Sequence, residues 1–322
     1  MVNEYAKNQN HTLLIGEEST FGTGVSTTKD IGLVQSINID ENNNTSAVFS
    51  SGARTAAELV DGDFSGKATV SLLLQHGRIF EYLFGGTTTH SDLTGGDYKH
   101  TFSVGNDLKS FTMENAFNLS TDAGKDHVGC KINSLTVEMD LGGTVSVTAE
   151  IMYKASEATS STGSAVISTL KTFKSFQASL STGTDSSETS IPVERFKITF
   201  TNDSEEIRSI GSRTPDAIVP NNLKIDFEFT KSFQNNTEYV RFSGSGGTVE
   251  TSLTAFSLII NANNGVAAGS GRQEMNFDFN NVKYSSYGEA KSVDGRVIQT
   301  FKGVAKGLTD CFITDTIASG SW

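Results

Sequence analysis

A chain of 322 residues is longer than one ordinary hydrophobic core supports, so we expect two domains. Charged residues make up 19% and hydrophobic residues 36%, with 21 Phe and only 3 Pro, a composition typical of a folded, strand-rich protein. The net charge of −12 excludes a surface that binds nucleic acid tightly, because such binding depends on Lys and Arg displacing phosphate counterions.

The predicted elements of the first half are strands, an arm and one short helix. Residues 41–57 are expected to form a long extended loop or arm that bridges neighbouring subunits, or else an ordinary surface loop. Residues 75–84 have apolar side chains at helical spacing before a Gly-Gly pair, which predicts a helix. Polar and apolar residues alternate with a period of two over 134–141 and 144–151, which predicts a hairpin with one solvated face.

The second half shows the same kinds of element. A run of small polar residues at 155–165 is typical of a linker or exposed loop. Beyond it, a second arm is expected over 200–216, and strict alternation over 224–230 and 274–279 predicts strands with one solvated face. Residues 234–242 predict a second short helix that stops near a glycine.

The chain also resembles itself. Residues 32–60 align without a gap on residues 191–219, at a constant offset of 159. The matched pairs include Gly52 with Gly211 and Arg54 with Arg213, which strand propensity alone would not select. Chance similarity between strand-like segments is the alternative. A duplication predicts a first domain over 1–155 that includes an N-terminal segment 1–30, a linker over 156–169 and a second domain over 170–322.

The sequence carries no visible catalytic or metal-binding chemistry. The histidines are scattered, and no nucleophile elbow, phosphate cradle or paired-ligand spacing occurs. Cys130 and Cys311 are expected to be small buried residues without a disulfide. We therefore predict a protein that is not an enzyme and has no cofactor, metal or catalytic residue. With no basic segment before an apolar one and no run of 18 apolar residues, we also expect neither export nor a membrane anchor.

Several strings resemble one family. GEESTFGTG at 16–24, FKSFQASLSTG at 173–183 and VERFKITFTNDSEEIRSIGSRTPDAIV at 193–219 are similar to tail tube (major tail) proteins of long-tailed phages and tailed archaeal viruses. The first copy departs from the Gly-Ser-Arg-x-Pro signature, because Ala56 stands where the second copy has Pro215. The resemblance is therefore weaker for the first half.

The resemblance implies a mainly β fold and a place in a virion tail. Each half would be a two-sheet antiparallel β-sandwich or barrel with a short flanking helix, and two such tube domains would let three chains form a pseudo-hexameric ring. Stacked rings would make a hollow tube for genome ejection, assembled in the host cytoplasm, with tape measure, tail terminator and baseplate proteins as partners and double-stranded DNA passing without specific binding. An adhesion or receptor-binding β module of a virion or cell surface is the alternative.

Two sets of residues are candidates for function in such a tube. Arg54 and Arg213 are expected at a junction between domains or subunits, because the planar guanidinium suits fixed bidentate partners; a solvated arginine is the alternative. Carboxylates that alternate with apolar residues are expected to line the channel and give it a negative potential, unless they face outward to solvent. These candidates are Glu138, Asp140, Glu150, Asp226, Glu228, Glu274 and Asp278.

Overall fold

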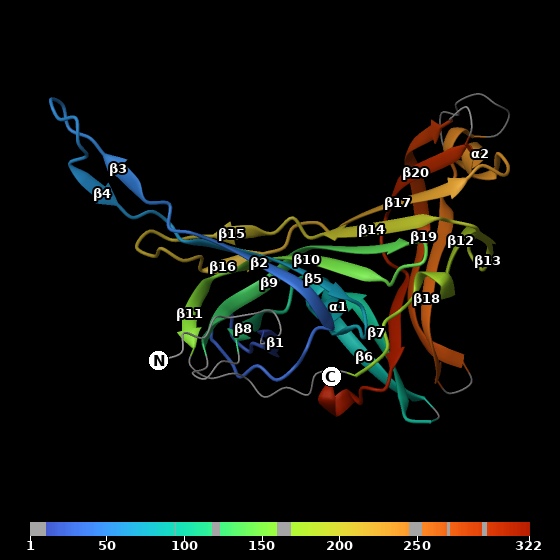
Figure 1. Cartoon of the computed structure of the whole chain (residues 1–322), viewed down its shortest axis with the longest axis horizontal. Helices are drawn as coiled ribbons and strands as arrows, with labels where there is room; N and C mark the ends of the chain where they lie inside the picture. Colours follow the sequence, from blue (N-terminus) through green and yellow to red (C-terminus); the bar gives the residue numbers. More distant parts are fainter. Residues whose placement is uncertain are drawn as a thin grey trace.

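The computed structural model describes residues 11–93, 95–117, 123–159, 169–244, 253–268, 271–291 and 295–322. Strands dominate these ranges, every strand pairing in them is antiparallel, and two short α-helices accompany the sheets (Figure 1). The predicted mainly β class, with packed antiparallel sheets and a few helical residues, is confirmed. Most of the predicted linker, residues 160–168, lies outside the described residues, as does 1–10 of the N-terminal segment.

The elements of the first half run from residue 11 to residue 159. They are β1 (His11–Glu17), β2 (Leu33–Asn42), β3 (Ser46–Val48), β4 (Glu58–Val60), β5 (Ser65–Leu73), α1 (Arg78–Phe84), β6 (Gly85–Leu93), β7 (Asp97–Val104), β8 (Phe111–Phe117), β9 (Ala123–Asp140), β10 (Ser146–Tyr153) and β11 (Ala155–Thr159).

The elements of the second half follow from residue 175. They are the 3-10 turn η2 (Ser175–Gln177), β12 (Ala178–Thr184), β13 (Ser187–Ile191), β14 (Arg195–Thr201), β15 (Glu205–Ile207), β16 (Ala217–Val219), β17 (Lys224–Ser232), α2 (Thr237–Ser243), β18 (Phe256–Ala268), β19 (Gly271–Ala290), β20 (Ile298–Ala305), β21 (Asp310–Asp315) and the turn η3 (Ser319–Ser321).

Eight strands form one continuous stretch of sheet that crosses both halves. Their order is β2, β5, β10, β9, β14, β17, β20 and β19, four strands from each half. Alternate apolar residues such as Val70, Leu135, Ile198 and Phe227 are buried, as the period of two predicts. The polar residues between them form the opposite face, which is exposed or half-buried.

A second layer covers the apolar face of these eight strands. It contains β1, β8 and β11 beside the first part of β9, and β13, β12, β18, β21, β7 and β6 beside the first part of β19. The long strands β9 and β19 thus belong to both layers. Each changes layer where its register shifts at β-bulges, which bend a strand.

The two short helices form where the sequence predicts them. All seven residues of α1 are buried, and the helix ends at Gly85, whose φ of 66° is the left-handed conformation that glycine adopts without strain. Helix α2 ends before Gly244. Phe80 and Phe84 of α1 pack on rings of the second half, with centroids 5.4 Å from Phe277 and 5.2 Å from Phe200. The halves therefore share one hydrophobic core.

The order of strand pairing in the first half recurs in the second. The pairs β1–β8, β2–β5, β5–β10, β10–β9, β8–β9 and β9–β11 correspond to β12–β18, β14–β17, β17–β20, β20–β19, β18–β19 and β19–β21. The bulges recur too: the shift between Ile132 and Ser134 of β9 matches the one between Tyr284 and Ser286 of β19. The domain boundaries stay a prediction, because β14 pairs with β9 and β21 pairs with β7 across them.

Candidate assembly surface

Charged side chains of both signs lie side by side on the polar face of the eight strands. Glu138 of β9 lies opposite Lys197 of β14, which lies opposite Glu228 of β17, which lies opposite Lys302 of β20. Lys302 Nζ is 2.8 Å from Glu228 Oε2. The guanidinium of Arg195 pairs with Glu138 and lies 3.3 Å from Asp140 Oδ1.

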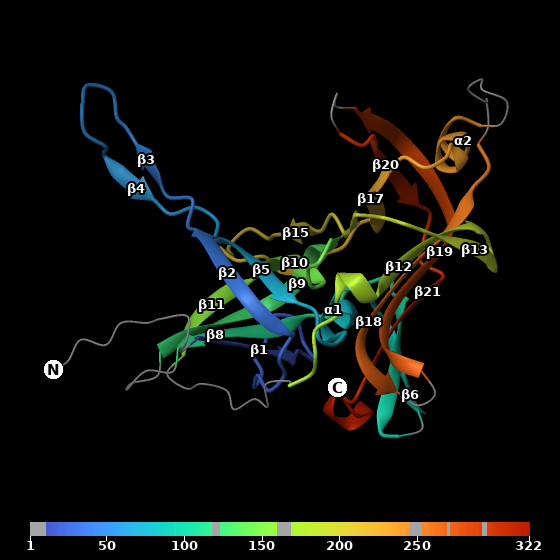
Figure 2. The same cartoon turned by 45° about the vertical axis from the view of Figure 1, so that its right-hand side comes forward.

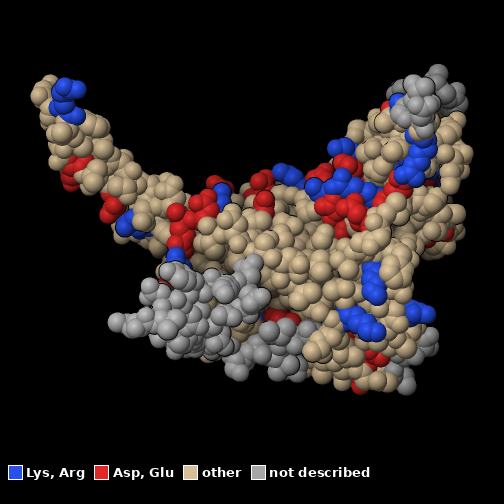
Figure 3. All heavy atoms as spheres, viewed as in Figure 1, with Lys and Arg blue, Asp and Glu red and all other residues tan. Residues whose placement is uncertain are grey.

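The structure brings together five of the seven candidate carboxylates. Glu138, Asp140, Glu150, Asp226 and Glu228 all project from the polar face of the eight strands, in register with one another. Their neighbours on this face include five cations, so the face is mixed in charge. These are Lys67, Arg195, Lys197, Lys224 and Lys302. Figure 3 shows both colours along the upper, hollowed margin of the molecule.

Glu274 and Asp278 lie elsewhere. Both belong to the first part of β19, between β18 and β21 in the second layer. Glu274 accepts a hydrogen bond from the Asn261 amide, 2.9 Å away. Partial burial raises the pKa of Asp278, and the facing carboxylates of Glu188, Asp185 and Asp310 raise it further. These two residues share the alternation of the other five, but not their surface.

Both ends of the eight-stranded stretch are open edges. On one side, β2 pairs only with β5 among the described strands. On the other, Tyr284–Ala290 of β19 pairs with β20, and no described strand takes its outer edge. Open edges present unpaired N–H and C=O groups, which are a template for pairing with another chain.

Two hairpin arms rise from corresponding places in the halves. The first arm (residues 43–62) contains β3 and β4, and the second arm (residues 202–221) contains β15 and β16. The second residue of each arm is left-handed, Asn44 with φ of 47° and Asp203 with φ of 50°. The first arm projects away from the body in both views, whereas the second runs alongside the first-half sheet (Figures 1 and 2).

The two candidate arginines have different surroundings. Arg213 of the second arm donates to the carbonyl oxygen of Gly62 at 2.9 Å and to Asn43 Oδ1 at 3.1 Å, and it lies 3.9 Å from Asp61. It therefore joins the second half to the first. Arg54 of the first arm is exposed. A contact of Arg54 with another subunit stays a prediction.

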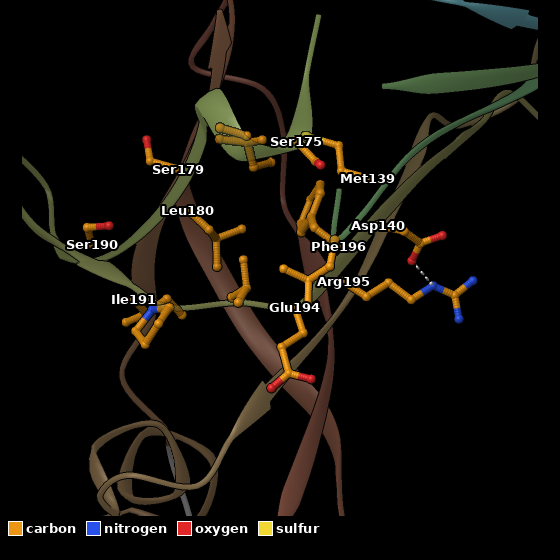
Figure 4. A pocket seen from close by; sticks show the side chains of 15 residues that line it. Met139, Asp140, Ser175, Ser179, Leu180, Ser190, Ile191, Glu194, Arg195 and Phe196 are labelled. Carbon is orange, nitrogen blue, oxygen red and sulfur yellow. Dashed lines mark ion pairs between the residues drawn. The ribbon is translucent and has the colours of Figure 1, made fainter. Parts of the chain in front are cut away.

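A shallow pocket lies where the end of β9 and the start of β14 meet the β12–β13 hairpin. Leu180, Ile191 and Phe196 contribute apolar lining, and the side chain of Arg195 extends away from them toward Asp140 (Figure 4). The pocket holds hydroxyls and carboxylates but no histidine or cysteine that would activate a nucleophile. Within the described ranges, no group of three His, Cys, Asp or Glu is placed to hold a metal ion.

The open edges, the polar face and the arms define an antiparallel β protein whose main sheet has two unpaired strand edges. The family model for phage tail tube proteins matches residues 8–297, and the chain belongs to this family. It is a structural component of a virion tail, and its family membership implies self-assembly into a tube. A comparison with curated proteins gives no match. None of the described helices is long and apolar enough to cross a membrane.

Sequence reasoning missed the cations of the polar face. Lys197, Arg195 and Lys302 follow the same period-two alternation that identified the carboxylates, so the pattern could have found them. It also missed the base of the first arm, where Gly62 and Asn43 receive Arg213. The sequence repeat could have indicated this site only together with the knowledge that the two copies touch each other there.

Proposed function

We propose that three copies of this chain join their eight-stranded stretches into a closed ring of 24 strands, and that such rings stack into the tail tube. The observation that carries the proposal is the continuous run from β2 to β19, with four strands from each half and both edges open. Pairing each β2 with the β19 of a neighbour removes both open edges of the eight-stranded stretch. Three chains then give the six quasi-equivalent units of a pseudo-hexameric ring.

The size of such a ring suits the passage of a genome. With strands about 4.8 Å apart, 24 strands give a circumference of about 115 Å and a diameter of about 37 Å before strand tilt widens it. A DNA duplex roughly 20 Å wide fits through this bore with room for side chains and water. The polar face of the eight strands would line it, since the apolar face is already covered by the second layer.

In this proposal the channel lining carries mixed charge and is not purely negative as the sequence predicted. Arg195 and Lys302 sit beside the carboxylates Glu138, Asp140 and Glu228, which supports a lining in which opposite charges alternate and largely cancel. A phosphate backbone would then meet no patch of free cations to bind, and genome ejection would proceed without specific contacts. The tape measure, tail terminator and baseplate proteins, and assembly in the host cytoplasm, enter the proposal from the family resemblance alone.

Electron microscopy and light scattering of the purified protein at rising concentration test the ring. We expect rings with three chains each, which stack into tubes with an open lumen as the concentration increases. Monomers at every concentration, without rings or tubes, would contradict the proposal and would suit an adhesion module instead.

A further inference from the structure

Besides the β7–β21 pair and the shared core, the two halves of one chain are joined by a second strand pair and by the second arm. Strand β9 pairs with β14 in antiparallel register, with Ser134 opposite Thr201 and Thr136 opposite Thr199. Directly after β14, the second arm lies on the first half. The amide of Asn202 donates to the carbonyl oxygens of Leu83, at 3.1 Å, and Ile132, at 2.9 Å.

The rest of the second arm is held by further contacts with the base of the first. The backbone N–H of Phe64 donates to the carbonyl oxygen of Arg213 at 2.7 Å, and Arg208 donates to the carbonyl oxygen of Phe64 at 2.7 Å. Pro215 and Ile218 of the arm are buried. These contacts, which we call the seat of the second arm, fix that arm on the first half of the same chain.

The first arm is the same hairpin without a seat. Its backbone bonds recur at an offset of 159: Gly62 N–H to the Asn43 carbonyl at 3.1 Å corresponds to Asn221 N–H to the Asn202 carbonyl at 2.9 Å. Every residue from 43 to 61 is exposed. Leu59 is 70% exposed, although its counterpart Ile218 has no exposed area. The first arm therefore exposes apolar side chains at a position that the second arm covers, and it lacks a corresponding surface to pack on.

The second half offers that surface. Following the shared pairings from strand to strand makes Ser286 of β19 the counterpart of Ser134 of β9, and Tyr284 the counterpart of Ile132. The outer edge of Tyr284–Ala290 has no described partner strand. The counterparts of Phe64 and Leu83 are Leu223 and Phe242. The second half therefore has both an open strand edge and the counterparts of the residues that form the seat of the second arm.

We propose that the first arm of each chain docks on the second half of a neighbouring copy, in the geometry that the second arm uses within the chain. The proposal rests on the ring described above and specifies its subunit junction. Strand β2 pairs antiparallel with the partner's β19, so that Asn42 lies opposite Ser286 of the partner subunit. Leu59 becomes buried, and Arg54 donates to the carbonyl oxygen of the partner's Asn221 and to Oδ1 of the partner's Asn202.

One difference between the arms fits this junction. Arg208 of the second arm corresponds to Phe49 of the first, which is 64% exposed and cannot donate to a carbonyl. Its ring would instead cover Leu223 of the partner subunit, an apolar contact in place of a polar one. Because each junction is head-to-tail, three junctions within chains and three between chains close a ring with one repeated geometry.

A pair of engineered cysteines tests the register. Residues directly opposite on antiparallel strands have Cα atoms about 4.5–5.5 Å apart, within reach of a disulfide. We expect Asn42→Cys with Ser286→Cys to form covalent dimers and trimers but nothing larger on oxidation of assembled protein. The matched control, Ser134→Cys with Thr201→Cys, should close within one chain and keep the monomer mass. The native Cys130 and Cys311 are both buried.

The outcomes separate this junction from the ring itself. If rings form and the control pair closes, but the Asn42→Cys and Ser286→Cys pair gives no covalent trimer, the proposed register is wrong and the ring stands. If the unmodified protein forms no rings at any concentration, the ring fails and the junction fails with it. Covalent chains longer than trimers would show head-to-tail contacts that do not close, and would also overturn the proposal.

Discussion

Leu59 and Ile218 hold the same place in their two arms, yet Leu59 is 70% exposed and Ile218 is completely buried. The backbone around them is the same: the N–H of Ala57 donates to the Val48 carbonyl and the N–H of Asp216 to the Ile207 carbonyl, each at 2.8 Å. The difference therefore comes from what covers each arm. Ile218 belongs to the arm that is hydrogen-bonded to the first half of its own chain, and we infer that Leu59 is covered only in the assembled ring.

Truncating these two residues should have opposite effects on folding and assembly. Ile218→Ala is expected to lower the free energy of unfolding of the unassembled chain by about 2–5 kcal/mol, because it leaves a cavity in a packed site. Leu59→Ala should change that free energy by less than about 0.5 kcal/mol, as exposed substitutions do, but should raise the concentration needed for rings. Urea unfolding and light scattering measure the two effects. Normal assembly of Leu59→Ala would contradict the seat of the first arm.

The matched arginines allow a second comparison. Arg213→Lys removes the planar fork that spans Gly62 and Asn43, so we expect a loss of about 1 kcal/mol from the unfolding free energy of the single chain. Arg54→Lys should leave the single chain unchanged and weaken ring formation instead. Thermal unfolding at low protein concentration, followed by sedimentation at high concentration, distinguishes the two. Equal behaviour of both variants in both measurements would refute their roles at corresponding junctions.

The elements that local pattern predicted are those whose signal is complete within a few residues. Alternation over 134–141 and 224–230 predicted parts of β9 and β17, because side chains of a strand alternate between its faces. The helix over 75–84 was predicted from apolar spacing and a terminal glycine, and α1 confirms it at Arg78–Phe84. These signals need no knowledge of distant parts of the chain.

What the sequence did not predict depends on contacts between distant residues. The β6–β7 hairpin pairs with β21, so that Thr101 lies opposite Phe312, and no local pattern indicates a partner so far along the chain. Glu274 alternates with apolar residues as Glu138 does, but β19 changes layer along its length and places Glu274 on another surface. Alternation gives the face of a strand and cannot identify the layer to which that part of the strand belongs.

Charge balance on the polar face should control genome passage. Glu138→Lys with Glu228→Lys leaves Lys302 without its carboxylate and Arg195 with Asp140 alone, and it adds two lysines, so the bore would present free cations to phosphate. We expect tubes to assemble but DNA ejection to slow, with the defect relieved by added salt. Asp92→Lys on β6 of the second layer is the control for a charge reversal away from this face. Unchanged ejection through normal tubes would show that this face does not meet the genome.

Acid should destabilise the single chain through His127. Its ring is buried beside Tyr153, with centroids 4.6 Å apart, and Nδ1 lies 3.7 Å from Glu41 Oε1. Burial lowers the pKa of His127 from 6.5 to about 4, although the nearby Glu41 carboxylate opposes the shift and Lys125 adds to it. The unfolded chain therefore binds this proton more readily than the folded chain. The stabilisation from the neutral ring is complete above pH 6.5 and is lost as the pH falls toward 4.

The size of this effect follows from the shift in pKa. Each unit corresponds to 1.36 kcal/mol, so the lowered value predicts a loss of about 3 kcal/mol between pH 6.5 and 4. In His127→Phe this component should disappear, and the unfolding free energy should depend less steeply on pH over that range. Urea unfolding of both proteins at pH 7, 5 and 4, below the concentration at which rings form, measures the difference. Identical pH profiles for the two proteins would mean that His127 is not the group that titrates, whatever the carboxylates contribute to both.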